Sequence, residues 1–179
     1  MALIKEESFL NETVPELAKR ILIAARTAPK TRGKDNIYTA ILTGDDILSL
    51  AEKMKQIGND DDNHIFLRDA QNLIDGAKAV ILIGCRINSA GLKYCGLCGF
   101  DNCDEKNKKP DIPCVFNTTD LGIAVGSAVS LAADLRIDNR IMYTIGMAAK
   151  EMNLPDKVCK ITYGIPLSVS SKNPFFDRK

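Results

Sequence analysis

Apolar residues recur every three or four positions along several stretches of the chain, and they form short continuous runs in others. Between Thr13 and Ala28 this spacing is typical of an amphipathic helix, and Glu16 follows Thr13 as in a capping box. Pro29 ends the pattern. The same spacing predicts four further helices, at about residues 45–58, 64–75, 121–135 and 147–152.

Short apolar segments predict the strands of one sheet. They lie at about residues 37–43, 79–84, 140–145 and 158–163. Helices and strands alternate along the chain, with neither an internal repeat nor a linker between them. We therefore expect one α/β-type domain of two or three layers over residues 1–179.

One long polar stretch, residues 86–117, interrupts this alternation, and we call it the cysteine segment. It is longer than the irregular connections that compact domains usually contain. Gly, Asn, Asp, Lys and Pro dominate it, so it offers little apolar surface against which thiols would pack. It nevertheless holds four of the six cysteines, Cys95, Cys98, Cys103 and Cys114. These four cysteines predict a single metal or inorganic cofactor site.

The cysteine spacing favours an iron–sulfur cluster. Two residues separate Cys95 from Cys98, which places two thiolates in one turn, and Gly96 and Gly99 each follow a cysteine. Glycines allow backbone N–H groups to point back at the sulfur atoms, where they offset negative charge. Zinc held by four thiolates is the main alternative, although zinc ribbons usually have two Cys-x-x-Cys pairs. A group of free thiols is the third interpretation.

Two further features each allow two interpretations. Cys85 lies at the end of one predicted strand and Cys159 lies inside another, so both are expected to be core thiols. Cys85 is the candidate to replace Cys114 if the latter is not a ligand. A basic turn follows the first helix and forms either a phosphate-binding turn or a solvated loop; its charged residues are Lys30, Arg32 and Lys34.

Composition and charge exclude few function classes. The net charge of +1 suggests neither a nucleic acid nor a membrane as a partner, and we expect neither. The apolar runs, such as residues 79–83, are too short to span a bilayer, and the N-terminus lacks the pattern of a signal peptide. We expect a cytoplasmic protein with reduced cysteines. His64 is the only histidine and belongs to no catalytic signature, so no catalytic residue is nominated.

Several stretches resemble known families. The run Cys-Gly-x-Cys-Gly-x-x-x-Cys at residues 95–103 resembles the [4Fe–4S] motif of small ferredoxin-type domains. Residues 14–30, 121–135 and 141–166 resemble the first helix and loop, the interface helix and the closing strand–helix–strand pattern of FMN-dependent nitroreductases. The combination resembles ferredoxin-domain proteins of the domain-of-unknown-function 2148 type. It implies an α+β fold, a nitroreductase-like three-layer α/β/α sandwich in which the cysteine segment is a cluster-binding insertion.

The same resemblance implies a homodimer with FMN at the subunit interface. By position, Lys30, Thr31 and Arg32 belong to the loop that contacts the flavin. Gly146 corresponds to a position where a backbone N–H approaches the reactive edge of the flavin. Arg178 corresponds to a C-terminal basic residue that holds the FMN phosphate.

We therefore expect an iron–sulfur redox protein with one [4Fe–4S] cluster and FMN, which exchanges electrons with a redox partner protein or a small-molecule acceptor. This expectation includes an oxidoreductase activity. The alternative is a non-enzymatic binding or regulatory protein, stabilised by zinc or a cluster on a flavin-free fold. One departure favours that alternative: residues 5–10, Lys-Glu-Glu-Ser-Phe-Leu, replace an arginine-rich phosphate motif, and their two acids would repel a phosphate.

Overall fold

Four antiparallel strands form one sheet in the order β1–β2–β4–β3, in a computed structural model that describes residues 3–176. The strands are β1 (Ile37–Leu42), β2 (Ala79–Cys85), β3 (Asp138–Asn139) and β4 (Ile161–Ser168). In the centre of the sheet Ile83 of β2 lies opposite Thr39 of β1 and Tyr163 of β4. Every residue of β2 is buried, which explains why its sequence is a continuous apolar run rather than an alternating one.

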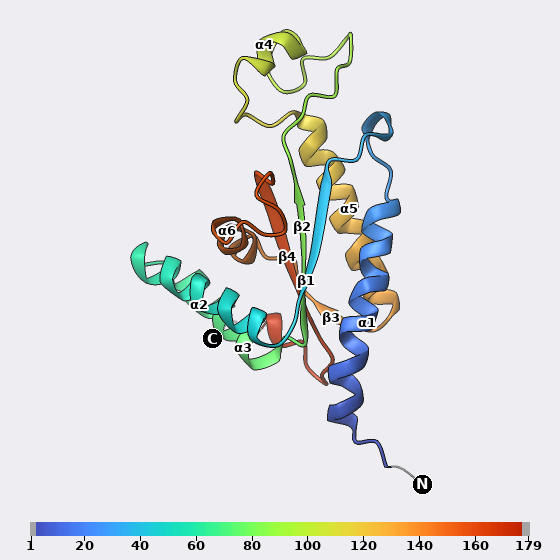
Figure 1. The fold of residues 1–179 in the computed structure, drawn as a ribbon, viewed down its shortest axis with the longest axis vertical. Helices are drawn as coiled ribbons and strands as arrows, with labels where there is room; N and C mark the ends of the chain where they lie inside the picture. Colours follow the sequence, from blue (N-terminus) through green and yellow to red (C-terminus); the bar gives the residue numbers. More distant parts are fainter. Residues whose placement is uncertain (1–2, 177–179) are drawn as a thin grey trace.

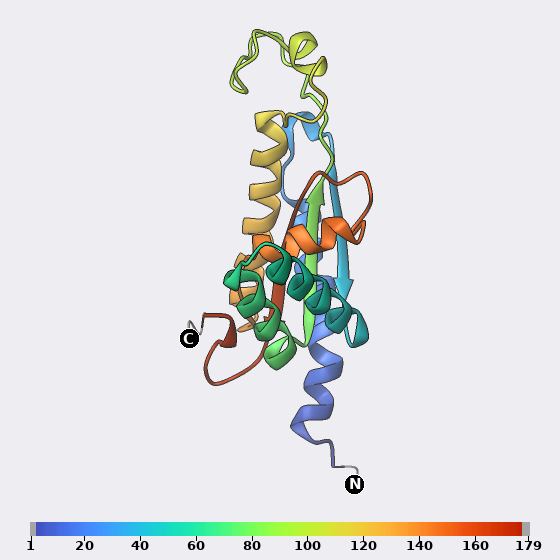
Figure 2. The same ribbon diagram turned by 90° about the vertical axis from the view of Figure 1, so that its left-hand side faces the viewer.

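Helices cover both faces of the sheet, so the fold has three layers (Figures 1 and 2). One face is covered by α1 (Glu6–Thr27) and α5 (Val115–Asp134), and the other by α2 (Asp45–Asp60), α3 (His64–Gly76) and α6 (Tyr143–Glu151). Alternate residues of β2 supply the two cores: Ile81 and Ile83 face α1 and α5, whereas Val80 and Leu82 face the other layer.

The cysteine segment projects beyond the end of the sheet, between β2 and α5 (Figure 1). Most of it is irregular, apart from the short helix α4 (Cys103–Asn107). Its last three residues form the first turn of α5. Short 3₁₀ turns also occur at Thr31–Gly33 and Pro174–Phe176.

Several predicted boundaries are wrong. The first helix begins at Glu6 rather than Thr13, because Pro15 is accommodated inside it and two acids occupy its first turn, where they favour the helix N-terminus. Helix α5 begins at Val115 rather than at residue 121, and α6 begins at Tyr143 rather than at residue 147. Strand β4 runs from Ile161 to Ser168 rather than over residues 158–163. The helices predicted at residues 45–58 and 64–75 and the strands at 37–43 and 79–84 are confirmed to within two residues.

The strand predicted over residues 140–145 is wrong, because the chain there turns into α6. Only Asp138 and Asn139 form a strand, and Met142 then makes one isolated bridge to Gly164. Helix α6 packs so closely on β4 that a Cβ atom at Gly164 would lie 2.0 Å from Ile145 Cγ2. This tertiary contact, which a strand could not make, outweighs the β propensity of the local sequence.

Candidate metal centre

Two buried asparagines hold the ends of the cysteine segment: Asn36 ties its start to the sheet, and Asn117 in α5 ties its start to its own end. Asn36, at the start of β1, accepts a hydrogen bond from Arg86 Nε at 2.8 Å, and its backbone carbonyl accepts another from Arg86 N at 3.1 Å. Asn117, in the first turn of α5, accepts from the backbone N–H of Asn88 at 3.0 Å. Because Asn36 and Asn117 are buried, these bonds hold the departure and the return of the segment close together.

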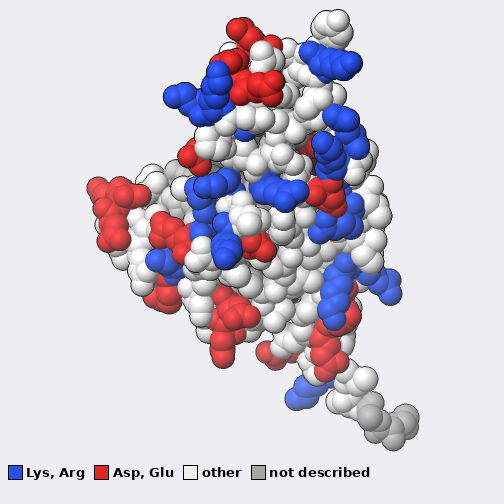
Figure 3. All heavy atoms as spheres, turned by 45° about the horizontal axis from the view of Figure 1, so that its top comes forward, with Lys and Arg blue, Asp and Glu red and all other residues white. Residues whose placement is uncertain are grey.

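A third attachment comes from the basic turn. The guanidinium of Arg32 donates to the backbone carbonyls of Ala90 and Gly91, at 3.1 and 3.0 Å. On the other side of the segment, the exposed Lys160 and Asp111 form an ion pair at 3.3 Å. Basic and acidic side chains are intermixed over the face that Figure 3 shows, where the end carrying the segment comes forward.

The cysteines of the segment differ in exposure. Cys95, Cys98 and Cys103 are partly exposed, whereas Cys114, immediately before α5, is buried. A tight turn joins Cys95 to Cys98, since the N–H of Gly99 donates to the carbonyl of Gly96 at 2.9 Å. Gly99 has a φ of +86°, a conformation that strongly favours glycine. All six cysteines of the chain are free thiols.

Within residues 3–176, no three His, Cys, Asp or Glu side chains are placed so that they could hold a metal ion together. The chemical type of the ligands nevertheless fits a centre bound by four thiolates, since four cysteines lie in one anchored segment. Metal or cluster binding would have to draw these thiols together, as ordinarily happens where folding and binding are coupled.

The two remaining cysteines are buried in the body of the fold. Burial and, to a smaller extent, the neighbouring Cys159 together raise the pKa of Cys85 to about 12. Burial also raises the pKa of Cys159 to about 11. Both groups are therefore neutral thiols near neutral pH, which makes them poor nucleophiles and poor metal ligands.

The residues predicted to contact flavin in the basic turn are engaged within their own chain. Lys30 Nζ donates to the carbonyls of Ala25 and Arg26, at 2.8 and 2.6 Å, and so caps α1. Burial lowers the pKa of Lys30. Thr31 donates to the carboxylate of Asp120 through its backbone N–H and its hydroxyl, with the hydroxyl 2.9 Å from Oδ1. The turn therefore joins α1 to α5.

Gly146, also predicted to contact flavin, lies on the opposite face of the sheet from α1. A Cβ atom there would be 1.8 Å from the carbonyl oxygen of Thr162, so close packing of α6 on β4 requires a glycine. The single chain does not bring Gly146 together with the basic turn. Arg178 lies outside the described residues.

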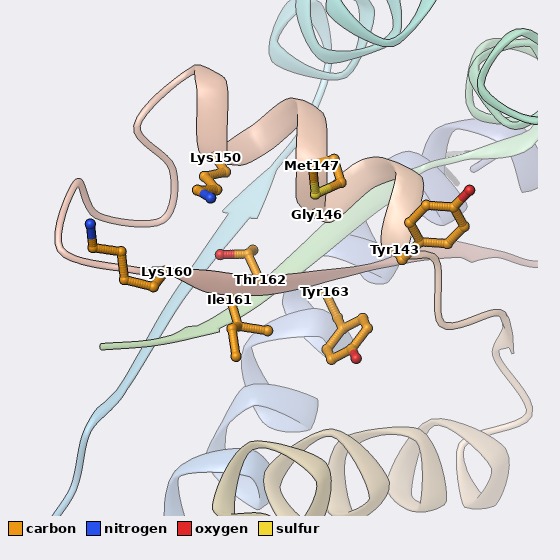
Figure 4. Close-up of a pocket in the computed structure, with 8 residues that line it drawn as sticks. All are labelled: Tyr143, Gly146, Met147, Lys150, Lys160, Ile161, Thr162 and Tyr163. Atoms are coloured by element: carbon orange, nitrogen blue, oxygen red, sulfur yellow. The ribbon is translucent and has the colours of Figure 1, made fainter. Parts of the chain in front are cut away.

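A pocket of about 220 Å³ lies between α6 and the start of β4. Figure 4 shows Lys150 and Lys160 at one end and Tyr143 at the other, with Thr162 between them, whereas Tyr163 points to the opposite side of β4, where it packs against the core beneath α1 and α5. The hydroxyl of Thr162 is buried and has no hydrogen-bond partner. The pocket thus combines two ammonium groups with the ring of Tyr143 at its far end.

The sequence interpretation missed two polar residues. Asp120 lies in a largely apolar helix, and that isolation is a signal that could have marked it. Lys106 is 3% exposed within the cysteine segment, but it is one of many lysines there, and nothing in the sequence distinguishes it.

The family described as "Uncharacterized protein containing a ferredoxin domain (DUF2148)" matches residues 111–178. A protein of Archaeoglobus fulgidus, described as "Uncharacterized protein", is 39% identical over 184 residues, which cover 98% of this chain and 97% of that protein. The chain belongs to the DUF2148 family. The matched region of the DUF2148 family includes Cys114 and begins after Cys103.

The DUF2148 chain also resembles solved nitroreductases. A nitroreductase family protein from Clostridium novyi NT has a TM-score of 0.57 at 13% identity, over 94% of this chain and 77% of that one. A nitroreductase with bound FMN from Desulfitobacterium hafniense DCB-2 has a TM-score of 0.57 at 13% identity, over 96% and 81%. At this identity the comparisons show the fold alone. The predicted nitroreductase-like α+β fold is confirmed.

Proposed function

We propose that this DUF2148 protein is an iron–sulfur redox protein with one [4Fe–4S] cluster held by Cys95, Cys98, Cys103 and Cys114. The observation that carries the proposal is the presence of four cysteines in one segment whose start is held to the sheet by the buried Asn36 and to its own end by the buried Asn117. Bound there, such a cluster supplies one-electron transfer.

The chain's own residues have defined tasks in this proposal. The Gly96–Gly99 turn presents Cys95 and Cys98 from one short piece of backbone. The N-terminal end of α5 favours negative charge at Cys114, which precedes it. Arg32 donates hydrogen bonds to the part of the segment that leads toward the cysteines.

The pocket between α6 and β4 supports a small-molecule acceptor as the partner. Lys150 and Lys160 favour an anionic group, and the ring of Tyr143 favours an aromatic or apolar body. Asp111 of the cysteine segment pairs with Lys160, so this pocket adjoins the segment. The alternative partner is a redox protein that binds at the projecting cysteine segment.

A homodimer formed through α5 is also proposed. This helix exposes a stripe on one side, which consists of Gly122, Ile123, Gly126 and Ser130. Ile123 is 40% exposed in the single chain, and an added Cβ at either glycine would meet nothing within 4 Å. A second copy could therefore approach this helix closely. We place the protein in the cytoplasm, because six cysteines without a disulfide fit a reducing compartment.

FMN is the least supported part of the expected function. In the described chain, Lys30, Thr31 and Arg32 are occupied by contacts with α1, α5 and the cysteine segment, and Gly146 faces another side of the sheet. The residues of one chain therefore do not fit FMN without a partner subunit. This observation favours the second candidate function, a zinc- or cluster-stabilised binding or regulatory protein on a flavin-free fold.

Anaerobic purification followed by iron, acid-labile sulfide and zinc analysis tests the proposal, together with a visible spectrum. We expect iron and sulfide in equal amounts with broad visible absorbance. One zinc per chain in a colourless protein would refute the redox function and support the second candidate. Flavin absorption bands, present or missing, decide the question of FMN, and sedimentation of the same sample decides the dimer.

Substitution of single cysteines tests the ligand assignment. We expect Cys95→Ser and Cys98→Ser to abolish loading, whereas Cys159→Ser, which removes a buried core thiol, leaves the iron content unchanged. If Cys114→Ser retains full iron while Cys85→Ser does not, the fourth ligand is Cys85.

A further inference from the structure

The basic turn already holds an anion of its own chain. It lies beside the first turns of α5, at the end of the sheet that carries the cysteine segment (Figure 1). There Asp120, which is 6% exposed, accepts from the backbone N–H of Thr31 at 3.0 Å and from its hydroxyl at 2.9 Å. A phosphate at this turn would have to displace a buried carboxylate, whose charge repels it. In the single chain the turn therefore fits neither a phosphate nor a flavin.

Arg32 is the residue of the turn that reaches the cysteine segment. Its backbone has a φ of +58°, a left-handed conformation that is uncommon for any residue other than glycine. From there its guanidinium donates to the carbonyls of Ala90 and Gly91, at 3.1 and 3.0 Å. Gly91 is shaped to receive it, with a φ of +73° and with Arg32 Nη1 only 3.3 Å from where a Cβ would lie. A rare backbone conformation that brings one side chain onto the segment indicates a positioning role.

In the described chain, Arg32 provides the last hydrogen bonds between the cysteine segment and the rest of the protein before the first of the cysteines. Within residues 3–176, residues 92–110 form no hydrogen bond or ion pair with any residue outside the segment. The next attachment is the exposed ion pair between Asp111 and Lys160. Three of the four cysteines lie within this stretch: Cys95, Cys98 and Cys103.

We infer that Arg32 is a positioning residue for the centre held by the four cysteines, and that the basic turn serves to hold Arg32 rather than to bind flavin. This inference rests on the proposed function only in requiring a thiolate-bound centre in the segment. Because Arg32 fixes residues 90 and 91 before a metal arrives, binding has less conformational entropy to remove. Without Arg32, binding itself must order these residues, and the affinity falls.

The size of the effect comes from the fixed residues and not from the length of the loop. Without Arg32 the nearest attachment is the bond from Asn88 to Asn117, three positions earlier. Loop-closure entropy grows only with the logarithm of the length, so this change contributes little. Ordering the backbone of one residue corresponds to about a tenfold change in affinity.

The test uses Arg32→Met, which keeps an apolar stem and removes the donors, with Lys34→Met as the matched control. Lys34 carries the same charge in the same turn, is exposed, and forms no side-chain hydrogen bond or ion pair within the described residues. The probe is Zn²⁺ added to the metal-free protein in competition with a chelator. We expect Arg32→Met to weaken Zn²⁺ binding about tenfold, and Arg32→Lys to restore part of the loss. Lys34→Met should change the affinity by less than about twofold.

Two further measurements on the metal-free protein separate positioning from general stability. Arg32→Met should lower the urea midpoint no more than Lys34→Met does, because the freedom regained by the segment offsets the lost hydrogen bonds. Amide hydrogen exchange of residues 90–93 should be faster in Arg32→Met than in Lys34→Met. Should Arg32→Met fail to fold, Arg32→Gly, which suits the left-handed backbone, should give the same loss of affinity.

The two levels of the proposal fail differently. Wild-type protein that carries no iron, sulfide or zinc and binds no added Zn²⁺ would overturn the proposed function itself. If the wild type binds Zn²⁺ and Arg32→Met weakens binding no more than Lys34→Met, the role of Arg32 is overturned and the centre stands. Any affinity of the wild type for FMN should be unchanged in Arg32→Met. An FMN affinity that this variant abolishes would make the turn a flavin site and contradict the inference.

Discussion

Replacement of Gly146 by alanine separates a packing role from a flavin role. An alanine Cβ would lie 1.8 Å from the carbonyl oxygen of Thr162, 2.6 Å from its carbonyl carbon and 3.2 Å from Tyr163 Cα. Ordinary van der Waals contact begins at 3.4 Å, so α6 and β4 would have to separate by 3.4 − 1.8 = 1.6 Å at this point. All three atoms belong to the backbone of β4, and no side-chain rotation can relieve the clash.

The magnitude follows from two opposing effects. Alanine in place of glycine within a helix gains about 1 kcal/mol of helix propensity. Overpacking of a close contact costs about 1–3 kcal/mol, and the upper end applies here because the backbone must move. We therefore expect Gly146→Ala to lower the free energy of unfolding by about 2 kcal/mol. Gly122→Ala, with nothing within 4 Å of its Cβ in the single chain, should instead raise the free energy of unfolding of the monomer by up to about 1 kcal/mol.

Urea unfolding of the FMN-free protein measures both variants, at one protein concentration because association would change the apparent stability. A packing role predicts a lower midpoint for Gly146→Ala with an unchanged dependence on urea. The reasoning is refuted if Gly146→Ala is as stable as the wild type in the absence of flavin. Gly126→Ala, in an equally open position on α5, is the second control.

Three further predictions concern buried polar groups. Asp120→Ala removes the acceptor of the Thr31 hydrogen bonds and should destabilise the protein by about 2 kcal/mol in urea unfolding, whereas the exposed Asp134→Ala should change little. Thr162→Val removes a buried hydroxyl without a partner and should raise the free energy of unfolding by about 1 kcal/mol, while Thr162→Ser should not. The pKa of Cys85 is raised from 9.0 to about 12, so the thiol loses its proton at lower pH in the unfolded chain than in the folded one. The free energy of unfolding should therefore fall as the pH rises between these two values. Cys85→Ala should make that fall smaller, as measured by unfolding midpoints at successive pH values.

Each of these predictions has a contrary result. Equal losses from Asp120→Ala and Asp134→Ala would show that the bonds to Thr31 contribute nothing. A less stable Thr162→Val would mean that the hydroxyl has a partner in solution, such as ordered water. An unchanged pH profile in Cys85→Ala would show that this thiol does not titrate differently in the folded and unfolded states.

Local patterns in the sequence predicted those parts of the fold in which packing and propensity agree. The buried run of β2 and the amphipathic faces of α2 and α3 are of this kind. Residues 140–145 are not, because the chain turns at Tyr143 into a helix that is held by close contact with β4. That contact depends on Gly146 and Gly164, eighteen positions apart, and no local window contains both.

For the candidate site, the sequence marks the segment but not its attachments to the rest of the fold. The spacing of Cys95, Cys98 and Cys103 marks the cysteine segment directly. The pairing of Thr31 with Asp120 spans 89 positions, and the burial of Lys106 depends on how the whole segment folds over α4. Neither feature produces a periodic pattern in the sequence, so neither could be predicted without the structure.

The basic turn shows why the function of a fold does not transfer residue by residue. Lys30, Thr31 and Arg32 occupy positions that the resemblance assigns to flavin, yet here they cap α1, bind Asp120 of α5 and hold the carbonyls at residues 90 and 91. A turn engaged in this way links both helices of one face to the cysteine segment. Displacing it toward a ligand would release that link. The turn can therefore anchor the segment or bind a flavin, and one chain cannot do both with the same donors.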